Sequence, residues 1–363
     1  MYKQTQSHRD DLRNAMHRVR ASLSVRAKHP VFATPICILI FFCVLFVQFA
    51  CLSANIRAQG PDEDIVITRK PGSDKTVKRR GKIVEWKGMS MTFHSTNKDR
   101  NIDNDEIVDL KTNWGESYLL GTRELSAGRT RIAIEKIGQA LDKENRPWAK
   151  RIVRAKLIDA YLTIEKPEAA VLQFLEILRE DPQTRFLYAA PLPWAGSGSA
   201  LVQQSEAWLN ARDPATQLIG AGWSLAGPNR KKAQQVLLSL SKDIDPRIRC
   251  LAIGQLWRAR ANVSGKQTEV WQGLVDKMPR EYRAGPTFVL ANVQAQCQKT
   301  DEALINFMRI PILYPKQRYL AAAALYRSAK MLHNGGKSAK GQSLINELVS
   351  KYPETIWAQQ ATN

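Results

Sequence analysis

Cysteine is scarce in this chain of 363 residues, which contains only five. Three of them, Cys37, Cys43 and Cys51, belong to one hydrophobic run, so Cys250 and Cys297 are the two that remain. Two thiols cannot build a disulfide framework, and neither has histidine or cysteine neighbours at zinc-ligand spacing. We expect two buried, unpaired thiols, and a disulfide between them only if their two helices stack.

Motifs for catalysis are also missing. The chain has no GxxxxGK[ST] phosphate loop and no HExxH zinc pair, and the glycines between residues 220 and 227 have the wrong spacing for a dinucleotide-binding turn. Of five histidines, only His94 and His333 follow the hydrophobic run, so a serine or cysteine nucleophile has no histidine nearby in sequence. These absences favour a protein that is not an enzyme, without catalytic residues, cofactor or metal.

Long hydrophobic runs are absent with one exception, residues 31–50, which read VFATPICILIFFCVLFVQFA and carry no charge. At about 1.5 Å of rise per residue, such a helix just crosses a hydrocarbon layer of about 30 Å. The charged residues before it are mostly basic, seven lysines and arginines against two aspartates, which predicts a cytoplasmic tail over 1–30. We therefore predict a single-pass anchor over 31–52, with the bulk of the chain periplasmic or extracytoplasmic.

Two other interpretations of this run stay open. A cleaved signal segment would leave a secreted protein, but Ala50, Ala54 and Ala58 each lack a small residue two positions earlier. A buried helix of a soluble core is the other alternative. A lipoprotein signal does not fit, because Gln48 and Phe49 are unsuitable residues ahead of Cys51.

Charge of one sign dominates. The net charge is +20, and the 46 basic and 32 acidic residues after residue 60 still leave +14. Such an excess attracts acidic partners, anionic lipid headgroups or acidic polymers of the cell envelope. Nucleic acid is not an expected partner of an exported chain. A solvated surface without a dedicated partner explains the charge equally well.

A small β-rich module is predicted over 62–112, because hydrophobic residues alternate with a period of two there. Met89, Met91 and Phe93 alternate after a Lys-Gly turn, which suits a hairpin. With two further short strands between 102 and 110, five strands would form a closed or half-closed barrel.

The run GKIVEWKGMSMTF, residues 81–93, resembles the strongly bent hairpin of SH3-like and Sm-like barrels. That resemblance implies binding of peptides or nucleic acid. The adjacent Lys78, Arg79, Arg80 and Lys82 are candidate contacts for an anionic lipid or polymer. A solvated strand face that repels incoming strands explains the same cluster.

A helical period of 3.6 replaces the strand pattern from Trp114 to the C-terminus. Ala170, Phe174 and Pro182 show a spacing that recurs along this part of the chain. Four cassettes carry small residues where two helices would cross, large residues beside them and prolines that end the second helix: Gly121, Ala133 and Ala140; Leu157, Tyr161, Ala170, Phe174 and Pro182; Ala291, Ala303, Phe307 and Pro315; Ala329, Ile345 and Pro353.

These cassettes resemble tetratricopeptide repeats (TPR) of bacterial membrane-anchored proteins, over residues 114–182 and 286–353. The resemblance implies a mainly α fold, an α-solenoid of antiparallel helix pairs over 113–185 and 283–363. It also implies a scaffold that binds other proteins in its groove. The cassettes depart from the family in that Gly341 replaces the usual alanine, and their spacing exceeds the family's 34 residues.

Residues 186–282 keep the helical rhythm without the repeat signature, and we interpret them as a degenerate α-solenoid. Asp213 and Asp245, each followed by proline, are good helix starts. Helices are expected over 200–211, 214–226, 229–242, 246–261 and 267–278.

An alternative function is an exported enzyme whose active site lies in a helical toroid. Its only candidate carboxylates are Asp243, Asp245 and Glu269, which are loosely spaced in the middle section. The tryptophans of that section are either packing residues between helices or an exposed binding surface.

Overall fold

The computed structural model describes residues 63–362, except 71, 97, 197 and 261. The predicted basic tail over 1–30 and the predicted anchor over 31–52 lie outside the described residues. No helix within the described part is both long enough and apolar enough to cross a bilayer. Gly60–Asn363 forms one compact unit, and its described part is mainly helical with a small antiparallel sheet.

Five antiparallel strands form the sheet, in the order β4-β3-β2-β1-β5. They are β1 (Asp64–Arg69), β2 (Thr76–Lys87), β3 (Ser90–Ser95), β4 (Lys98–Asp103) and β5 (Ile107–Lys111), with a 3-10 turn η1 (Asn104–Glu106) before β5. The predicted hairpin is the β2–β3 pair, and Gly88 adopts φ +57° in its turn. The sheet stays open, because β4 and β5 each have one neighbouring strand, so hydrogen bonds do not close the expected barrel.

β2 is long enough to pair with two other strands. Its first half pairs with β1 and its second half with β3, and Gly81 lies where the two halves meet. A Cβ atom at Gly81 would lie 2.0 Å from the carbonyl oxygen of His94. Only glycine therefore allows β3 to approach β2 this closely.

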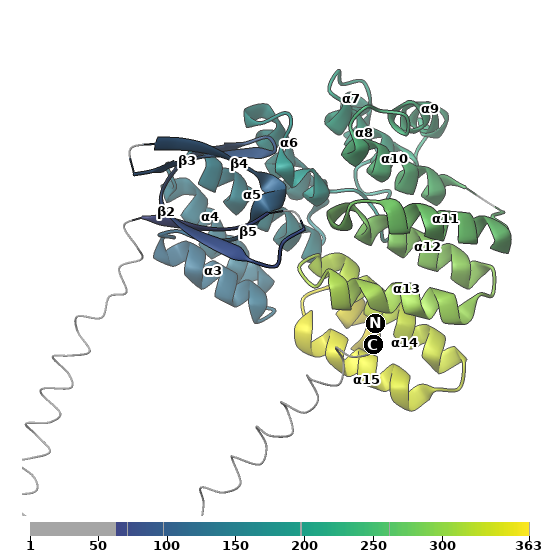
Figure 1. Cartoon of the computed structure of the whole chain (residues 1–363). Coiled ribbons are helices and arrows are strands. Elements are labelled where there is room, and N and C mark those ends of the chain that lie inside the picture. Colours follow the sequence, from purple (N-terminus) through teal and green to yellow (C-terminus); the bar gives the residue numbers. More distant parts are fainter. Residues whose placement is uncertain (1–62, 71, 97, 197, 261, 363) are drawn as a thin grey trace, which may run out of the picture. The chain divides into compact units, whose positions relative to one another are not determined.

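Each of the four predicted cassettes forms a helix pair. The pairs are α3 (Glu116–Ser126) with α4 (Thr130–Lys143), α5 (Pro147–Thr163) with α6 (Pro167–Glu180), α12 (Ala284–Gln296) with α13 (Thr300–Leu313), and α14 (Arg318–Asn334) with α15 (Ser338–Lys351). A last helix, α16 (Ile356–Thr362), follows. Figure 1 shows these pairs in chain order, from blue (α3) to yellow (α15).

The middle section also forms the predicted helices, with a shorter first one. It contains η2 (Arg185–Ala189), α7 (Ser205–Leu209), α8 (Pro214–Ser224), α9 (Arg230–Leu240), α10 (Pro246–Ala259), α11 (Gly265–Lys277) and η3 (Arg280–Tyr282). Asp213 accepts hydrogen bonds from the backbone N–H groups of Ala215 and Thr216, and Asp245 accepts one from Arg247. Both aspartates are therefore helix caps, as the sequence predicts.

The repeat-signature residues lie inside the helix pairs. Nearly all of the small and large ones are buried: Gly121, Ala133, Ala140, Leu157, Ala170, Phe174, Ala291, Ala303, Phe307 and Ala329. Tyr161 and Ile345 are half-buried. Pro182, Pro315 and Pro353 are exposed and follow the ends of α6, α13 and α15. These residues therefore fill the helix interfaces and mark the helix ends.

The last helix pair lies against the first two, which differs from the extended scaffold that the resemblance implies. α14 contacts α5, and the backbone N–H of Arg131 in α4 donates to Glu354 Oε2 at 2.8 Å. Gly128, before α4, leaves room only for Pro353, because an added Cβ would lie 2.8 Å from that ring. The helix pairs thus do not form an open array from first to last.

The sheet is fixed to the helices through α5. Its hydrophobic core continues into Trp148 and Ala149 of that helix. Arg151, one turn further along α5, is 2% exposed and donates to Glu85 Oε1 at 2.6 Å and to the carbonyl oxygen of Trp86 at 2.7 Å. The sheet and the helices therefore share one interface, where β2 and α5 contact each other (Figure 1).

Candidate binding site

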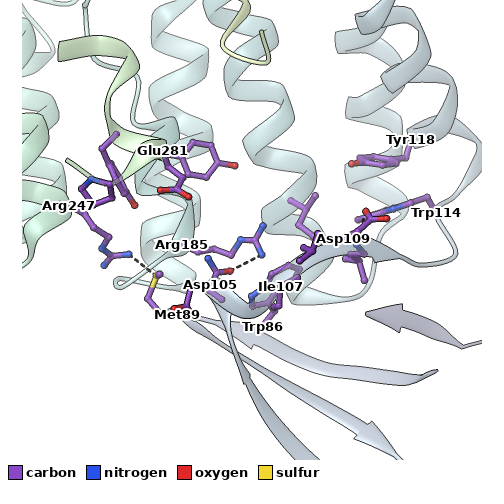
Figure 2. Close-up of a pocket in the computed structure, with 17 residues that line it drawn as sticks. Trp86, Met89, Asp105, Ile107, Asp109, Trp114, Tyr118, Arg185, Arg247 and Glu281 are labelled. Carbon is purple, nitrogen blue, oxygen red and sulfur yellow. Dashed lines mark hydrogen bonds between the residues drawn. The ribbon is translucent and has the colours of Figure 1, made fainter. Parts of the chain in front are cut away.

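A cavity of about 700 Å³ opens where the sheet meets the helices. Its walls come from β2 and the turn after it, from η1 and β5, from the start of α3, and from η2 and η3. Figure 2 shows Arg185 near its centre, with Trp114 and Tyr118 on one side and Arg247 and Glu281 on the other. Elements far apart in the sequence therefore build a single pocket.

One wall of the cavity is aromatic. The rings of Trp114 and Tyr118 stack with centroids 4.1 Å apart, and Tyr188 and Tyr282 also line the space. Burial raises the pKa of Tyr118 to about 12, so its phenol stays neutral at physiological pH. Tyr188 is 37% exposed, which leaves part of its ring open to a ligand. Such surfaces suit flat or aliphatic groups.

Arg185 is a half-buried cation of the site. Its guanidinium carbon lies 3.5 Å from the centroid of the Trp86 ring, and Nη1 donates to Asn104 Oδ1 at 3.1 Å. Burial lowers the pKa of Arg185 to about 10, so the group remains protonated at neutral pH. No carboxylate of the described residues pairs with it. A cation–π contact and a neutral amide therefore hold this charge in place.

The exposed charge at the cavity mouth is acidic. Asp105, Asp109 and Glu281 line the opening, are exposed, and form no ion pair with any residue that the structure describes. The other cation, Arg247, is already engaged, because it pairs with Asp245 at 2.8 Å and donates to the carbonyl oxygen of Thr184 at 2.9 Å. The rim therefore offers an incoming ligand three carboxylates without an ion-pair partner in the described residues, although Asp109 Oδ1 accepts a hydrogen bond from the backbone N–H of Leu110 at 2.9 Å.

A narrower cavity of about 290 Å³ adjoins the first one and shares Ile152, Arg185 and Tyr188 with it. Asp159 lies here, close to Lys156 and to the start of α14. Burial raises the pKa of Asp159 to about 6, although Arg318 and Lys156 act in the opposite direction. The site therefore combines a larger cavity with an acidic rim and a smaller adjoining cavity that contains Asp159.

The structure does not place the predicted anionic contacts in this site. Lys78, Arg79, Arg80 and Lys82 lie along β2, and Arg79 alone among them is half-buried. None of the four lines the cavity, and none pairs with a described carboxylate. Lys78, Arg80 and Lys82 lie on one face of β2 and Arg79 on the other, and their contact with an anionic lipid or polymer stays a prediction.

The carboxylates of the enzymatic alternative serve other purposes. Asp245 caps α10, Asp243 accepts from the backbone N–H of Asp245 at 2.8 Å, and Glu269 on α11 pairs with Lys299 at 2.8 Å. None of the three lines either cavity. Cys250 and Cys297, whose pairing the sequence leaves open, are both free thiols.

Arg185 and Tyr188 were missed by the sequence analysis. They lie in η2, a short turn that follows Pro182 and interrupts the helical pattern. The available signal was the dense run RFLY at residues 185–188, where a cation and two aromatic residues occur together just after a helix pair. Periodicity alone assigns no role to such a short segment.

No known protein family, no curated protein and no solved structure matches this chain. What the site binds is therefore inferred from its own chemistry.

Proposed function

We propose that the protein is a non-catalytic scaffold that binds a segment of a partner protein in the cavity between the sheet and the helices. The proposal rests on that cavity, which has a volume of about 700 Å³, opens to solvent, and has an aromatic wall and an acidic rim. Its size lies within the range of pockets that hold small ligands or a few side chains. In this proposal the helix pairs of the protein are TPR-like repeats, and the side of the pairs that would bind a partner faces the sheet.

The chemistry of the rim and wall defines the partner. Asp105, Asp109 and Glu281 attract a lysine or arginine, and the exposed part of Tyr188 accommodates an aromatic or aliphatic neighbour. The partner would therefore present a basic residue next to an apolar one, although the protein as a whole carries +20. Charges arranged this way give specificity and a faster encounter.

The predicted anchor over 31–52 belongs to the same proposal. A membrane anchor would hold the scaffold in the envelope and raise its local concentration near a partner on the same membrane. The basic tail over 1–30 would stay in the cytoplasm, so the rest of the chain after the anchor, including the cavity, would lie outside it.

Site-specific photocrosslinking tests the proposal. Val108 lines the cavity and is 49% exposed, so a photoreactive residue there should crosslink one partner. Leu172 on α6 is 55% exposed but lies outside the cavity, which makes it the matched control. We expect an adduct from position 108 only, and mass spectrometry should map it to a basic and apolar segment of the partner.

A synthetic peptide of that segment then allows a quantitative measurement. The triple variant D105N/D109N/E281Q should weaken peptide binding at least tenfold, since it removes all three rim charges. Identical adducts from positions 108 and 172, or peptide affinity unchanged in the triple variant, would rule out this cavity as the binding site.

A further inference from the structure

A separate cavity of about 390 Å³ in the helical part is strongly cationic. Four arginines line it and no aspartate or glutamate does: Arg230, Arg258, Arg260 and Arg327. They come from the start of α9, the last turn of α10, the residue after α10, and α14. This cavity shares no lining residue with the one in Figure 2.

Two of these arginines also contact backbone carbonyls. Arg230 donates from Nη1 to Leu225 O at 3.3 Å and from Nη2 to Ala259 O at 2.8 Å. These carbonyls belong to the C-terminal ends of α8 and α10, where cations are favoured. Arg258 donates to Gly222 O and to the side-chain oxygen of Gln255. These acceptors are neutral and use only part of each guanidinium, which carries five N–H donors.

The other two arginines have no structural partner in the described residues. The side chains of Arg260 and Arg327 are exposed and form no hydrogen bond or ion pair with any of those residues. Stabilisation of helix ends therefore accounts for Arg230 and Arg258 and leaves Arg260 and Arg327 without a role. Both guanidinium groups are therefore available to a ligand in this cavity.

The grouping is electrostatically costly without an anion. Burial, together with repulsion from Arg230, lowers the pKa of Arg258 to about 10, so its guanidinium remains charged at neutral pH. Like charges in a partly enclosed cavity raise the local positive potential, and a bound anion relieves it. No carboxylate in the cavity wall supplies that negative charge.

The remaining lining indicates the kind of anion. Guanidinium groups match the planar pairs of oxygens on phosphate and sulfate and bind them with two hydrogen bonds at once. Trp194, Phe288 and the amide of Asn292 line the same space, which suits the uncharged part of a small organic molecule. The cavity thus combines an oxyanion end with an aromatic wall.

We propose that this arginine cavity binds a small organic molecule through a phosphate or sulfate ester. Arg260 and Arg327 would contact the oxyanion directly, while Arg230 and Arg258, fixed by their carbonyl contacts, would supply the field. The uncharged part of the molecule would lie against Trp194. This site differs from the partner cavity, so either can fail without the other.

Calorimetry on the purified full-length protein tests the proposal, with inorganic phosphate, inorganic sulfate, glucose 6-phosphate and glucose 6-sulfate as probes. We expect at least one hexose ester to bind at least fivefold more tightly than its inorganic anion. The double variant R260Q/R327Q should weaken that binding about 10- to 100-fold. Added NaCl should weaken it in the wild type and much less in the variant.

Two further variants make the result specific. R100Q/R212Q removes two exposed arginines outside the cavity, on β4 and before α8, with the same change in net charge. Its affinity should stay within twofold of the wild type. R327K keeps the charge but loses the two-pronged contact, so its loss should lie between those of the wild type and the double variant.

Three results would overturn the proposal. The first is that none of the four probes binds. The second is that R100Q/R212Q loses as much affinity as R260Q/R327Q, which indicates attraction by net charge alone. The third is that inorganic anions bind as tightly as the hexose esters, which leaves the aromatic wall without a ligand. If R260Q/R327Q does not fold, R327K is measured in its place. An affinity of R327K equal to that of the wild type would also contradict the proposal.

Discussion

The carboxylate of Asp159, on α5, accepts a hydrogen bond from the backbone N–H of Arg318, the first residue of α14, at 3.1 Å. The residue before α14, Gln317, provides no side-chain cap of its own. Helix starts leave N–H groups without partners, and an acidic side chain there is favourable. Asp159 therefore caps a helix that begins 159 positions later and joins the second helix pair to the last.

This junction should make stability depend on pH. Asp159 has a pKa of about 6 in the folded protein, raised by burial, against about 3.9 in an unfolded chain. Below about pH 4 both states hold the proton, and between about pH 4 and 6 only the unfolded state loses it. The contribution of Asp159 to stability is therefore fully present below about pH 4 and is lost as the pH rises through about 6.

The variant D159N isolates this effect, because asparagine can still accept the Arg318 hydrogen bond but never ionises. We expect the melting temperature of D159N relative to the wild type to rise between pH 4 and pH 7, measured by differential scanning fluorimetry. D142N, at an exposed position of α4, is the control. A difference between D159N and the wild type that stays constant over this range would show that Asp159 is not the responsible group.

Replacing Arg151 should loosen the sheet from the helices. In R151M the carbonyl of Trp86 loses its partner, and Glu85 and Glu180 lose the cation between them. Removing one member of such a buried network costs about 3 kcal/mol of unfolding free energy. Urea denaturation of R151M and the wild type measures this loss of unfolding free energy.

R179M is the matched control for Arg151. Arg179 also pairs with a glutamate, Glu176, but its side chain is 73% exposed. Exposed pairs contribute little, so we expect a loss below about 0.5 kcal/mol. Equal losses in R151M and R179M would mean that the sheet does not depend on the buried contact.

Sequence patterns predict much of this fold, because its helix caps, turns and helix pairs are determined by residues that are close together in the sequence. The caps at Asp213 and Asp245 act within three residues, and the Gly88 turn is fixed by its own backbone. Helix pairs follow from periodic small and large side chains, so all four cassettes formed pairs. One boundary is wrong: the helix expected over 200–211 covers only Ser205–Leu209, and residues 200–204 form a turn before it.

Sites escaped prediction where distant segments create them. Arg185 and Trp86 stack although 99 residues separate them, and neither position belongs to a motif. The four arginines of the second cavity lie in α9, in α10, directly after α10 and in α14, where each resembles any surface arginine. The contact between α5 and α14 likewise depends on how the pairs turn relative to one another, which no repeat signature encodes.

Within the first helix pair, two glycines should respond in opposite ways to alanine. At Gly121 an added Cβ would lie 2.5 Å from Ile137 Cγ1 and 3.0 Å from the Ile137 backbone nitrogen, so G121A should lose about 1–3 kcal/mol. At Gly138, on α4, nothing lies within 4 Å, so G138A should gain about 0.5–1 kcal/mol from helix propensity. Chemical denaturation of both variants measures these changes in unfolding free energy. If G121A is as stable as the wild type, the two helices can move apart without a loss of unfolding free energy.

Gly285 on α12 holds open the space that Trp194 occupies beside the arginine cavity. A Cβ there would lie 2.2 Å from Trp194 Cε2, so G285A should displace the indole. The arginines stay in place, and we therefore expect weaker binding of glucose 6-phosphate, by about fivefold or more, with inorganic phosphate binding nearly unchanged. Tryptophan fluorescence should report the displacement, and calorimetry the two affinities. G273A on α11, where nothing lies within 4 Å, is the control. If G285A shifts the fluorescence yet binds both probes like the wild type, Trp194 takes no part in holding the organic group.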